Sequence, residues 1–226
     1  MVRLQGTEEA WMEPATIRRE TLILSAGVVF LLDPLLLELF HFVHTPKLVG
    51  LGLTRLIQTF GVLAIVLAFQ KSLAPIGLSN DHLWNGLKKG ALWALGTGII
   101  TLACFVLLYV LGVNPLKMLK TRLPHETIQI VFYFITGGLI APLAEEVFFR
   151  GVLFGFLRTW GFVFALCVST AIFASFHVLF SGQIIPVTQI AGGLLFAISF
   201  EKEKSLWVPI IIHATGNIAI FTLSLL

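Results

Sequence analysis

The chain has 226 residues, of which 57% are hydrophobic and only 12% are charged, and its formal net charge is +3. Soluble domains contain about 45–50% apolar and about 25% charged residues. The mean hydropathy of +0.95 points the same way. A soluble core could not enclose this much apolar surface, so lipid must be the solvent for most of it. The composition excludes a soluble globular protein, offers no basis for a nucleic-acid partner, and predicts an integral membrane protein.

Residues 1–20 are polar, and we expect them to form an N-terminal tail ahead of a single membrane-embedded domain over 21–226. The first apolar run starts too late and is too long for a signal peptide, so it is expected to stay in the protein. The apolar runs predict an all-α polytopic bundle of seven or eight transmembrane helices. The predicted spans cover about 21–43, 48–69, 90–112, 127–140, 141–159, 162–180, 184–200 and 205–225.

Two stretches interrupt this pattern. The segment 70–89 mixes Pro75 and charged residues with regularly spaced apolar ones, which predicts an amphipathic piece at the membrane surface. The stretch 127–159 is too long for one straight span at about 1.5 Å per residue. Gly137-Gly138 and Pro142 mark the place to divide it, because proline fits the first turn of a new helix.

The distribution of basic residues predicts an orientation. If the N-terminus is cytoplasmic, most of the lysines and arginines outside the spans fall on the cytoplasmic side, and the positive-inside rule favours that arrangement. The cytoplasmic set is Arg3, Arg18, Arg19, Lys71, Lys88, Lys89, Arg158, Lys202 and Lys204, and the outer set is Lys47, Lys117, Lys120 and Arg122.

The span 141–159 carries Glu145, Glu146 and Arg150. A charge in hydrocarbon costs roughly 2.5–3.5 kcal/mol on insertion scales, so these groups need partners. Glu146 and Arg150 stand one helical turn apart in the favourable order for an ion pair. Two adjacent carboxylates cannot both ionise cheaply. We therefore interpret Glu145 as a candidate general base and Glu146 as the structural partner of Arg150, with a purely structural ion pair as the alternative.

Two later spans repeat the one-turn spacing, with Phe173 four residues before His177 and His213 four residues before Asn217. Singly, such residues can be packing groups or bridges between helices. Together with Glu145 they fit water-mediated hydrolysis of an acyl group. Glu145 and His177 would deprotonate a water, and His213 with Asn217 would stabilise the oxyanion. Glu145, His177 and His213 could instead bind zinc, although an H-E-x-x-H motif is absent.

The strings E-E-x-x-x-R, F-x-x-x-H and H-x-x-x-N, in this order and separation, resemble the CAAX prenyl protease and bacteriocin-processing family of intramembrane peptidases. The resemblance covers about 70–226, whereas residues 1–69 are unspecific apolar sequence that includes Asp33, Arg55 and Gln58. It implies the compact prokaryotic form of the family. The roles that it implies are water activation by Glu145 and His177, oxyanion stabilisation by His213 and Asn217, and support by Glu146, Arg150 and Phe173.

The resemblance also implies an endopeptidase that acts on a membrane-anchored protein or peptide without a metal cofactor. Zinc bound by Glu145, His177 and His213 is the alternative for the mechanism. A catalytically silent binding or immunity protein of the same fold is the alternative for the function. We expect the protein to lie in a prokaryotic cytoplasmic membrane, with the lipid bilayer and its substrate as partners.

Overall fold

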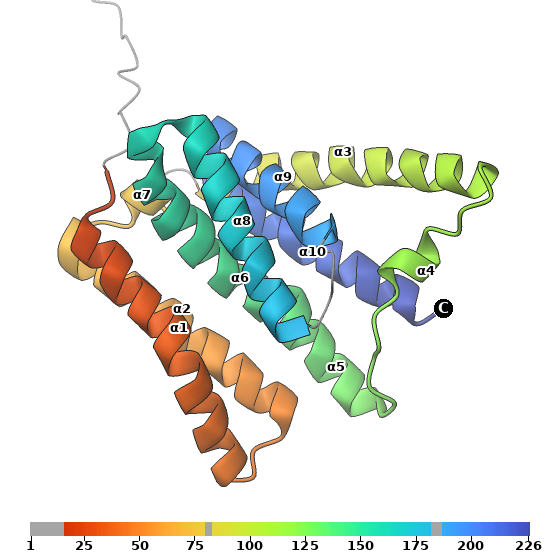
Figure 1. Ribbon diagram of the computed structural model, residues 1–226, viewed down its shortest axis with the longest axis horizontal. Helices are drawn as coiled ribbons and strands as arrows, with labels where there is room; N and C mark the ends of the chain where they lie inside the picture. The colour runs from red at the N-terminus through yellow and green to blue at the C-terminus, as the bar shows by residue number, and fades with distance from the viewer. Residues whose placement is uncertain (1–15, 80–82, 182–186) are drawn as a thin grey trace, which may run out of the picture.

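The computed structural model describes residues 16–79, 83–181 and 187–226, and all its regular structure there is helical (Figure 1). Most of the predicted tail over 1–20, residues 80–82 of the predicted surface piece and the start of the span predicted over 184–200 lie outside these ranges. The elements in chain order are α1 (Arg19–Phe42), α2 (Lys47–Gln70), η1 (Ala74–Ile76), α3 (Leu83–Val110), α4 (Leu116–Leu119), α5 (Thr127–Ile135), η3 (Thr136–Ile140), α6 (Ala141–Glu146), η4 (Val147–Phe154), α7 (Gly155–Leu157), η5 (Arg158–Trp160), α8 (Phe162–Ser181), α9 (Val187–Glu203) and α10 (Trp207–Ser224).

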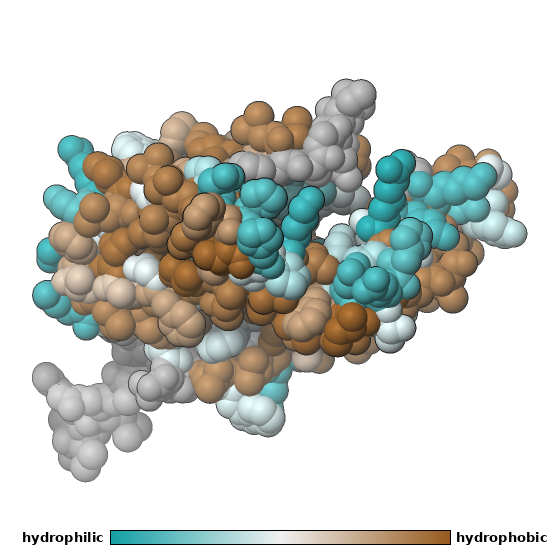
Figure 2. Space-filling model, turned by 90° about the horizontal axis from the view of Figure 1, so that it is seen from below, coloured by the Kyte–Doolittle hydropathy of each residue, from teal (hydrophilic) through white to brown (hydrophobic). Residues whose placement is uncertain are grey.

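The described chain contains six helical stretches that are long and apolar enough to cross a membrane. The helix α9, with 17 residues, is a seventh long helix. Apolar side chains cover most of the face shown in Figure 2, as expected for a surface that lipid solvates. The predicted all-α polytopic membrane bundle is confirmed.

The predicted division of 127–159 into two helices is wrong, because Thr127–Trp160 forms one continuous helical stretch. The chain passes Pro142 by widening its turn over η3, where the N–H of Ala141 bonds the carbonyl of Thr136, five residues back. A second wide, π-helical segment follows at η4. Wide turns of this kind accommodate an interruption of the helical hydrogen bonds without ending the helix, and they are frequent at functional sites.

The start of α3 also corrects the prediction of a separate surface piece. The helix begins at Leu83 rather than near residue 90, so Leu83, Trp84 and Leu87 belong to its first turns. Nothing from Leu83 onward breaks the helix, and the side chain of Lys88 lies over the ring of Trp84 at 5.4 Å. A lysine near a helix end can keep its charge in water while its stem covers apolar surface, so the helix extends through it.

The core lies around η4, all of whose residues are buried. Helices α1, α2, α8 and α9 pack around this segment, and η1 contacts it at one end. The helix α3 differs, since it projects away from the other helices and buries only Gly86 and Gly90, against α10 (Figure 1). The fold therefore places the stretch that carries Glu145, Glu146 and Arg150 at the centre of the bundle.

Candidate active site

Glu146 is fully buried and pairs with two groups on two helices. Its Oε1 accepts a hydrogen bond from Nη1 of Arg150 at 2.9 Å, so the predicted ion pair is present. The same oxygen lies 2.8 Å from Nδ1 of His213 on α10. Glu146 therefore links the central helix to α10 as well as holding Arg150.

Arg150 is enclosed by groups that suit a planar cation. Its guanidinium carbon lies 4.4 Å from the ring centre of Phe173 and 5.1 Å from that of Phe196. Its Nη2 donates to the carbonyl of Gly193 on α9 at 3.3 Å. The two rings and the carbonyl offset part of the free-energy cost of removing the guanidinium from water, because they contact its faces and a donor that the carboxylate does not reach. Arg150 thus joins the central helix to α8 and α9, and it is only 1% exposed.

Glu145 faces the two histidines. Its Oε2 lies 3.8 Å from Nε2 of His177 and 3.8 Å from Nε2 of His213. Both distances are too long for direct hydrogen bonds, and both leave room for a shared proton carrier such as a water or a substrate group. The structure thus brings together three candidates that come from three different helices.

The outer partners of the histidines determine which ring nitrogen carries the proton. Nδ1 of His177 lies 2.9 Å from the carbonyl of Phe173, which can only accept, so Nδ1 is the donor. Nδ1 of His213 lies 2.8 Å from Oε1 of Glu146, the oxygen that already accepts from Arg150, so this Nδ1 is also placed as a donor. In the neutral rings both Nε2 atoms therefore present lone pairs toward Glu145. Three acceptors that face one another need a proton donor between them, and a water supplies two protons.

Asn217 is placed differently from the other predicted site residues. Its Nδ2 donates to the carbonyl of Gly137 at 2.8 Å, one turn along α10 from His213. In the five-residue register of η3, the backbone donor for this carbonyl would come from position 142, which is Pro142 and has no N–H. Asn217 therefore satisfies a carbonyl that proline leaves without its backbone partner. One N–H of the amide remains for another acceptor.

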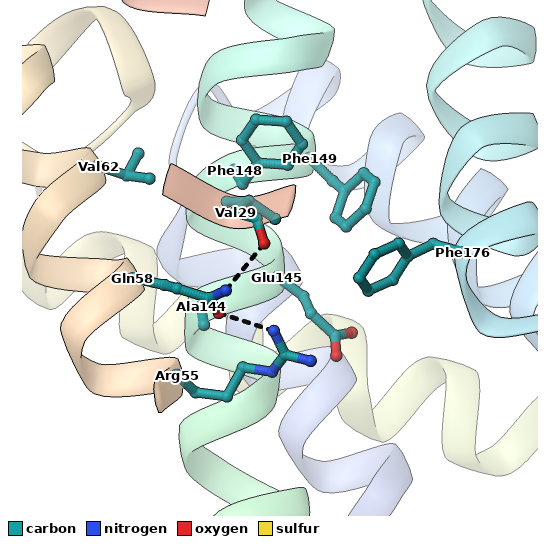
Figure 3. Close-up of a pocket in the computed structure, with 9 residues that line it drawn as sticks. All are labelled: Val29, Arg55, Gln58, Val62, Ala144, Glu145, Phe148, Phe149 and Phe176. Carbon is teal, nitrogen blue, oxygen red and sulfur yellow. Dashed lines mark hydrogen bonds between the residues drawn. The ribbon is translucent and has the colours of Figure 1, made fainter. Parts of the chain in front are cut away.

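A small cavity lies beside Glu145 and is lined by Arg55 and Gln58 of α2 together with apolar side chains of α1, η4 and α8 (Figure 3). The space open to the centre of a water molecule is about 10 Å³. That is close to the minimum for one water. The residues 1–69, which the sequence left without a function, thus contribute to the surroundings of Glu145.

The positions of the donor atoms bear on the zinc alternative. Within the described ranges, no group of three His, Cys, Asp or Glu side chains is placed to hold a metal ion. Zinc requires donors at about 2.0–2.2 Å in tetrahedral order. Glu145, His177 and His213 do not form such a set as they are placed.

Sequence reasoning missed the bond between Glu146 and His213 and the whole contribution of α9. The ring of Phe196 stacks on that of His213 at 4.5 Å with an interplanar angle of 19°. The pair Gly192-Gly193 was the available signal, because a Cβ at Gly193 would come within 2.8 Å of Thr170 on α8. Small residues of this kind indicate closely packed helices.

Comparisons with known proteins show what the chain is similar to. Residues 127–219 match the family model of the type II CAAX prenyl endopeptidase Rce1-like proteins. The chain is 28% identical over 173 residues to the "Putative membrane peptidase YdiL" of Bacillus subtilis (strain 168), covering 74% of this chain and 69% of that protein. It is 39% identical over 97 residues to the membrane-embedded CAAX protease MroQ of Staphylococcus aureus (strain USA300), covering 40% of this chain and 37% of that protein. No solved structure matches the chain. These matches support the resemblance to the CAAX prenyl protease and bacteriocin-processing family, and with the six apolar helices they identify the chain as an integral membrane peptidase.

Proposed function

We propose that this protein is an intramembrane endopeptidase that hydrolyses a peptide bond of a membrane-tethered protein or peptide with a water activated by Glu145 and His177. The observation that carries the proposal is the position of Oε2 of Glu145, 3.8 Å from Nε2 of both His177 and His213. Three converging proton acceptors inside an apolar bundle are costly unless they handle a proton. A water between them is the simplest occupant.

The proposed reaction begins when this water attacks the carbonyl carbon of the scissile bond. Glu145 and Nε2 of His177 take its proton, and the carbonyl oxygen becomes an oxyanion. The carbon–nitrogen bond then breaks, and the same proton passes to the leaving nitrogen. The products are one carboxylic acid and one amine for each water consumed, which become a carboxylate and an ammonium group in water, and the two side chains return to their starting states.

The oxyanion needs N–H donors. Nε2 of His213 would donate to it after receiving, from Glu145 at 3.8 Å, the proton that the water releases. Oε1 of Glu146, 2.8 Å from Nδ1, holds the ring in place for this step. Asn217 supplies the amide N–H that its bond to Gly137 leaves over. Glu146 and Arg150 therefore support catalysis by orienting His213, and Phe173 supports it by orienting His177.

The orientation in the membrane follows from the ends of the helices. Ion pairs between Lys89 and Glu203 at 2.8 Å and between Arg158 and Glu201 at 2.9 Å join three helices at one end of the bundle. This end carries more basic residues than the opposite one, which has Lys47, Lys117, Lys120 and Arg122. The positive-inside rule assigns it to the cytoplasm, together with the start of α1. We propose that the protein lies in a prokaryotic cytoplasmic membrane.

The test is a comparison of the membrane proteins of cells that carry the wild-type protein or the Glu145→Gln variant. We expect one or more membrane-anchored proteins to accumulate uncut with Glu145→Gln, as seen by mass spectrometry of their termini. Glu38→Gln is the matched control, because it makes the same chemical change at an exposed position of α1. Identical membrane proteins in all three strains would instead identify a catalytically silent binding or immunity protein.

A further inference from the structure

A second ion pair, between buried Asp33 and partly buried Arg55, lies between α1 and α2, outside the stretch that matches the family model. Nη1 of Arg55 donates to Asp33 at 2.8 Å and to the amide oxygen of Gln58 at 2.7 Å. The amide nitrogen of Gln58 donates to the carbonyl of Val29 at 2.9 Å and to Asp33 at 3.1 Å. Asp33, Arg55 and Gln58 thus form a cluster, which fixes Nη1 of Arg55 and the plane of its guanidinium.

The rest of the guanidinium is turned toward the site. Arginine has five N–H donors in a rigid fork, so anchoring Nη1 leaves Nη2 and Nε to face away from Asp33. Within the described part of the chain, the hydrogen bonds of this guanidinium all run through Nη1. Figure 3 shows Arg55 and Glu145 pointing toward the same cavity, which both of them line. These donors are therefore available to a group that lies beside Glu145.

Charge and size restrict what that group can be. Asp33 already pairs with Arg55, and the carboxyl group of Glu145 lines the same cavity, so the site has no unpaired cation for an additional anion. The cavity has room for about one oxygen-sized group, with about 10 Å³ open to the centre of a water. A neutral acceptor with a single exposed oxygen meets both conditions. A peptide carbonyl is such an acceptor, and in an apolar site it needs a donor.

We propose that Arg55 is a substrate-binding residue whose Nη2 and Nε donate to a main-chain carbonyl oxygen of the substrate, beside the bond that the water attacks. This inference rests on the proposed function. Asp33 and Gln58 act through Arg55, because they hold its plane toward the cavity. The α1–α2 hairpin thus forms one wall of the peptide-binding site.

The test uses Arg55→Lys and a quenched-fluorescent peptide built around the bond whose cleavage is lost in Glu145→Gln cells. Lysine keeps the charge that pairs with Asp33, so the hairpin packing is retained, but it loses the fork. We expect KM to rise about ten- to a hundredfold with little change in kcat, the loss of one hydrogen bond to a charged group. The control is Gln70→Met, which removes the 3.3 Å bond to Thr21 between the same two helices away from the cavity. We expect its KM to match the wild type.

Peptides ending in a free carboxylate and in an amide separate the possible acceptors. An equal rise in KM for both supports a main-chain carbonyl, and a rise confined to the free acid would overturn that assignment. Unchanged kinetics in folded Arg55→Lys, or a lower kcat with unchanged KM and a displaced pH profile, would also overturn it. These results leave the proposed function standing, since that proposal fails only if Glu145→Gln still cleaves the peptide.

Discussion

The two arginine–carboxylate pairs differ in what surrounds the guanidinium, which is buried at Arg150 and partly buried at Arg55. Arg150 is enclosed by the rings of Phe173 and Phe196 and by the carbonyl of Gly193, and it lines no cavity described above. Arg55 is held on one edge and borders the cavity with the other. We propose that the first pair stabilises the fold and orients His213, and that the second binds the substrate. Arg150 also has a donor without a partner, Nε, but that atom is enclosed, so the difference lies in the cavity that Arg55 borders.

Glu145, which lies between the two pairs, gives the largest expected effect. Glu145→Gln should lower kcat by about 10²–10⁴-fold, because it removes a general base while keeping the shape of the side chain. Peptide cleavage by the purified protein measures the loss, and the thermal unfolding midpoint should stay close to that of the wild type. A variant that loses activity only because it unfolds would contradict the catalytic assignment.

The pair of Glu146 and Arg150 should contribute more to the stability of the protein than the pair of Asp33 and Arg55. Arg150→Met leaves Glu146 buried without its cation and should destabilise the protein by about 3–5 kcal/mol. Arg55→Met should destabilise it less, because Gln58 still donates to Asp33. Unfolding in detergent measures both. Equal losses, or a larger loss for Arg55→Met, would show that the two pairs do not differ as described.

Asn217 allows a structural and a catalytic contribution to be separated. Asn217→Ala should destabilise the protein by about 1–3 kcal/mol, since the carbonyl of Gly137 loses its donor. In a Pro142→Ala background the backbone regains an N–H at that position, so the same substitution should destabilise the protein less. If Asn217 also binds the oxyanion, kcat should still fall in that background. Full recovery of kcat would assign Asn217 to structure alone.

Removal of metal should have the smallest effect. We expect strong chelators to leave activity unchanged and the purified protein to contain no stoichiometric zinc, because Glu145, His177 and His213 are not arranged as a ligand set. Metal analysis and activity after dialysis against a chelator measure this. About one equivalent of tightly bound zinc, with activity lost on removal and regained on return, would replace the metal-free mechanism.

Hydropathy and one-turn spacing predicted the features that depend on a single helix, which are the bounds of the spans and the ion pair within one of them. The spans at α1, α2, α8 and α10 begin and end within a few residues of the predicted bounds, because lipid imposes their length. The ion pair of Glu146 and Arg150 followed from helical geometry. Contacts between helices could not be predicted in this way, since spacing within one helix says nothing about its rotation against another. The bond from Glu146 to His213 is of this kind.

Two further features were not predicted, the continuity of the central helix and the contribution of Arg55. The continuity of the helix through Pro142 depends on wide turns, which no composition rule distinguishes from a break. The part played by Arg55 depends on the packing of α1 and α2 against the central helix. In the sequence Asp33, Arg55 and Gln58 were visible as polar residues in apolar spans, which was the signal that could have identified the cluster.

The weak burial of α3 has a consequence for how its sequence can vary. A helix that touches mainly lipid has no close-fitting neighbour to satisfy, so exchanges among apolar residues such as Leu92, Ile99, Ile100 or Val106 should be tolerated. Gly86 and Gly90 are different, because a Cβ there would collide with Ser205 and Ile211. In a scan of substitutions along α3, sensitivity should therefore be concentrated in its first half, at Gly86, at Gly90 and at Lys89 and Trp93, which both bond Glu203. The second half of the helix should require only hydrophobic residues.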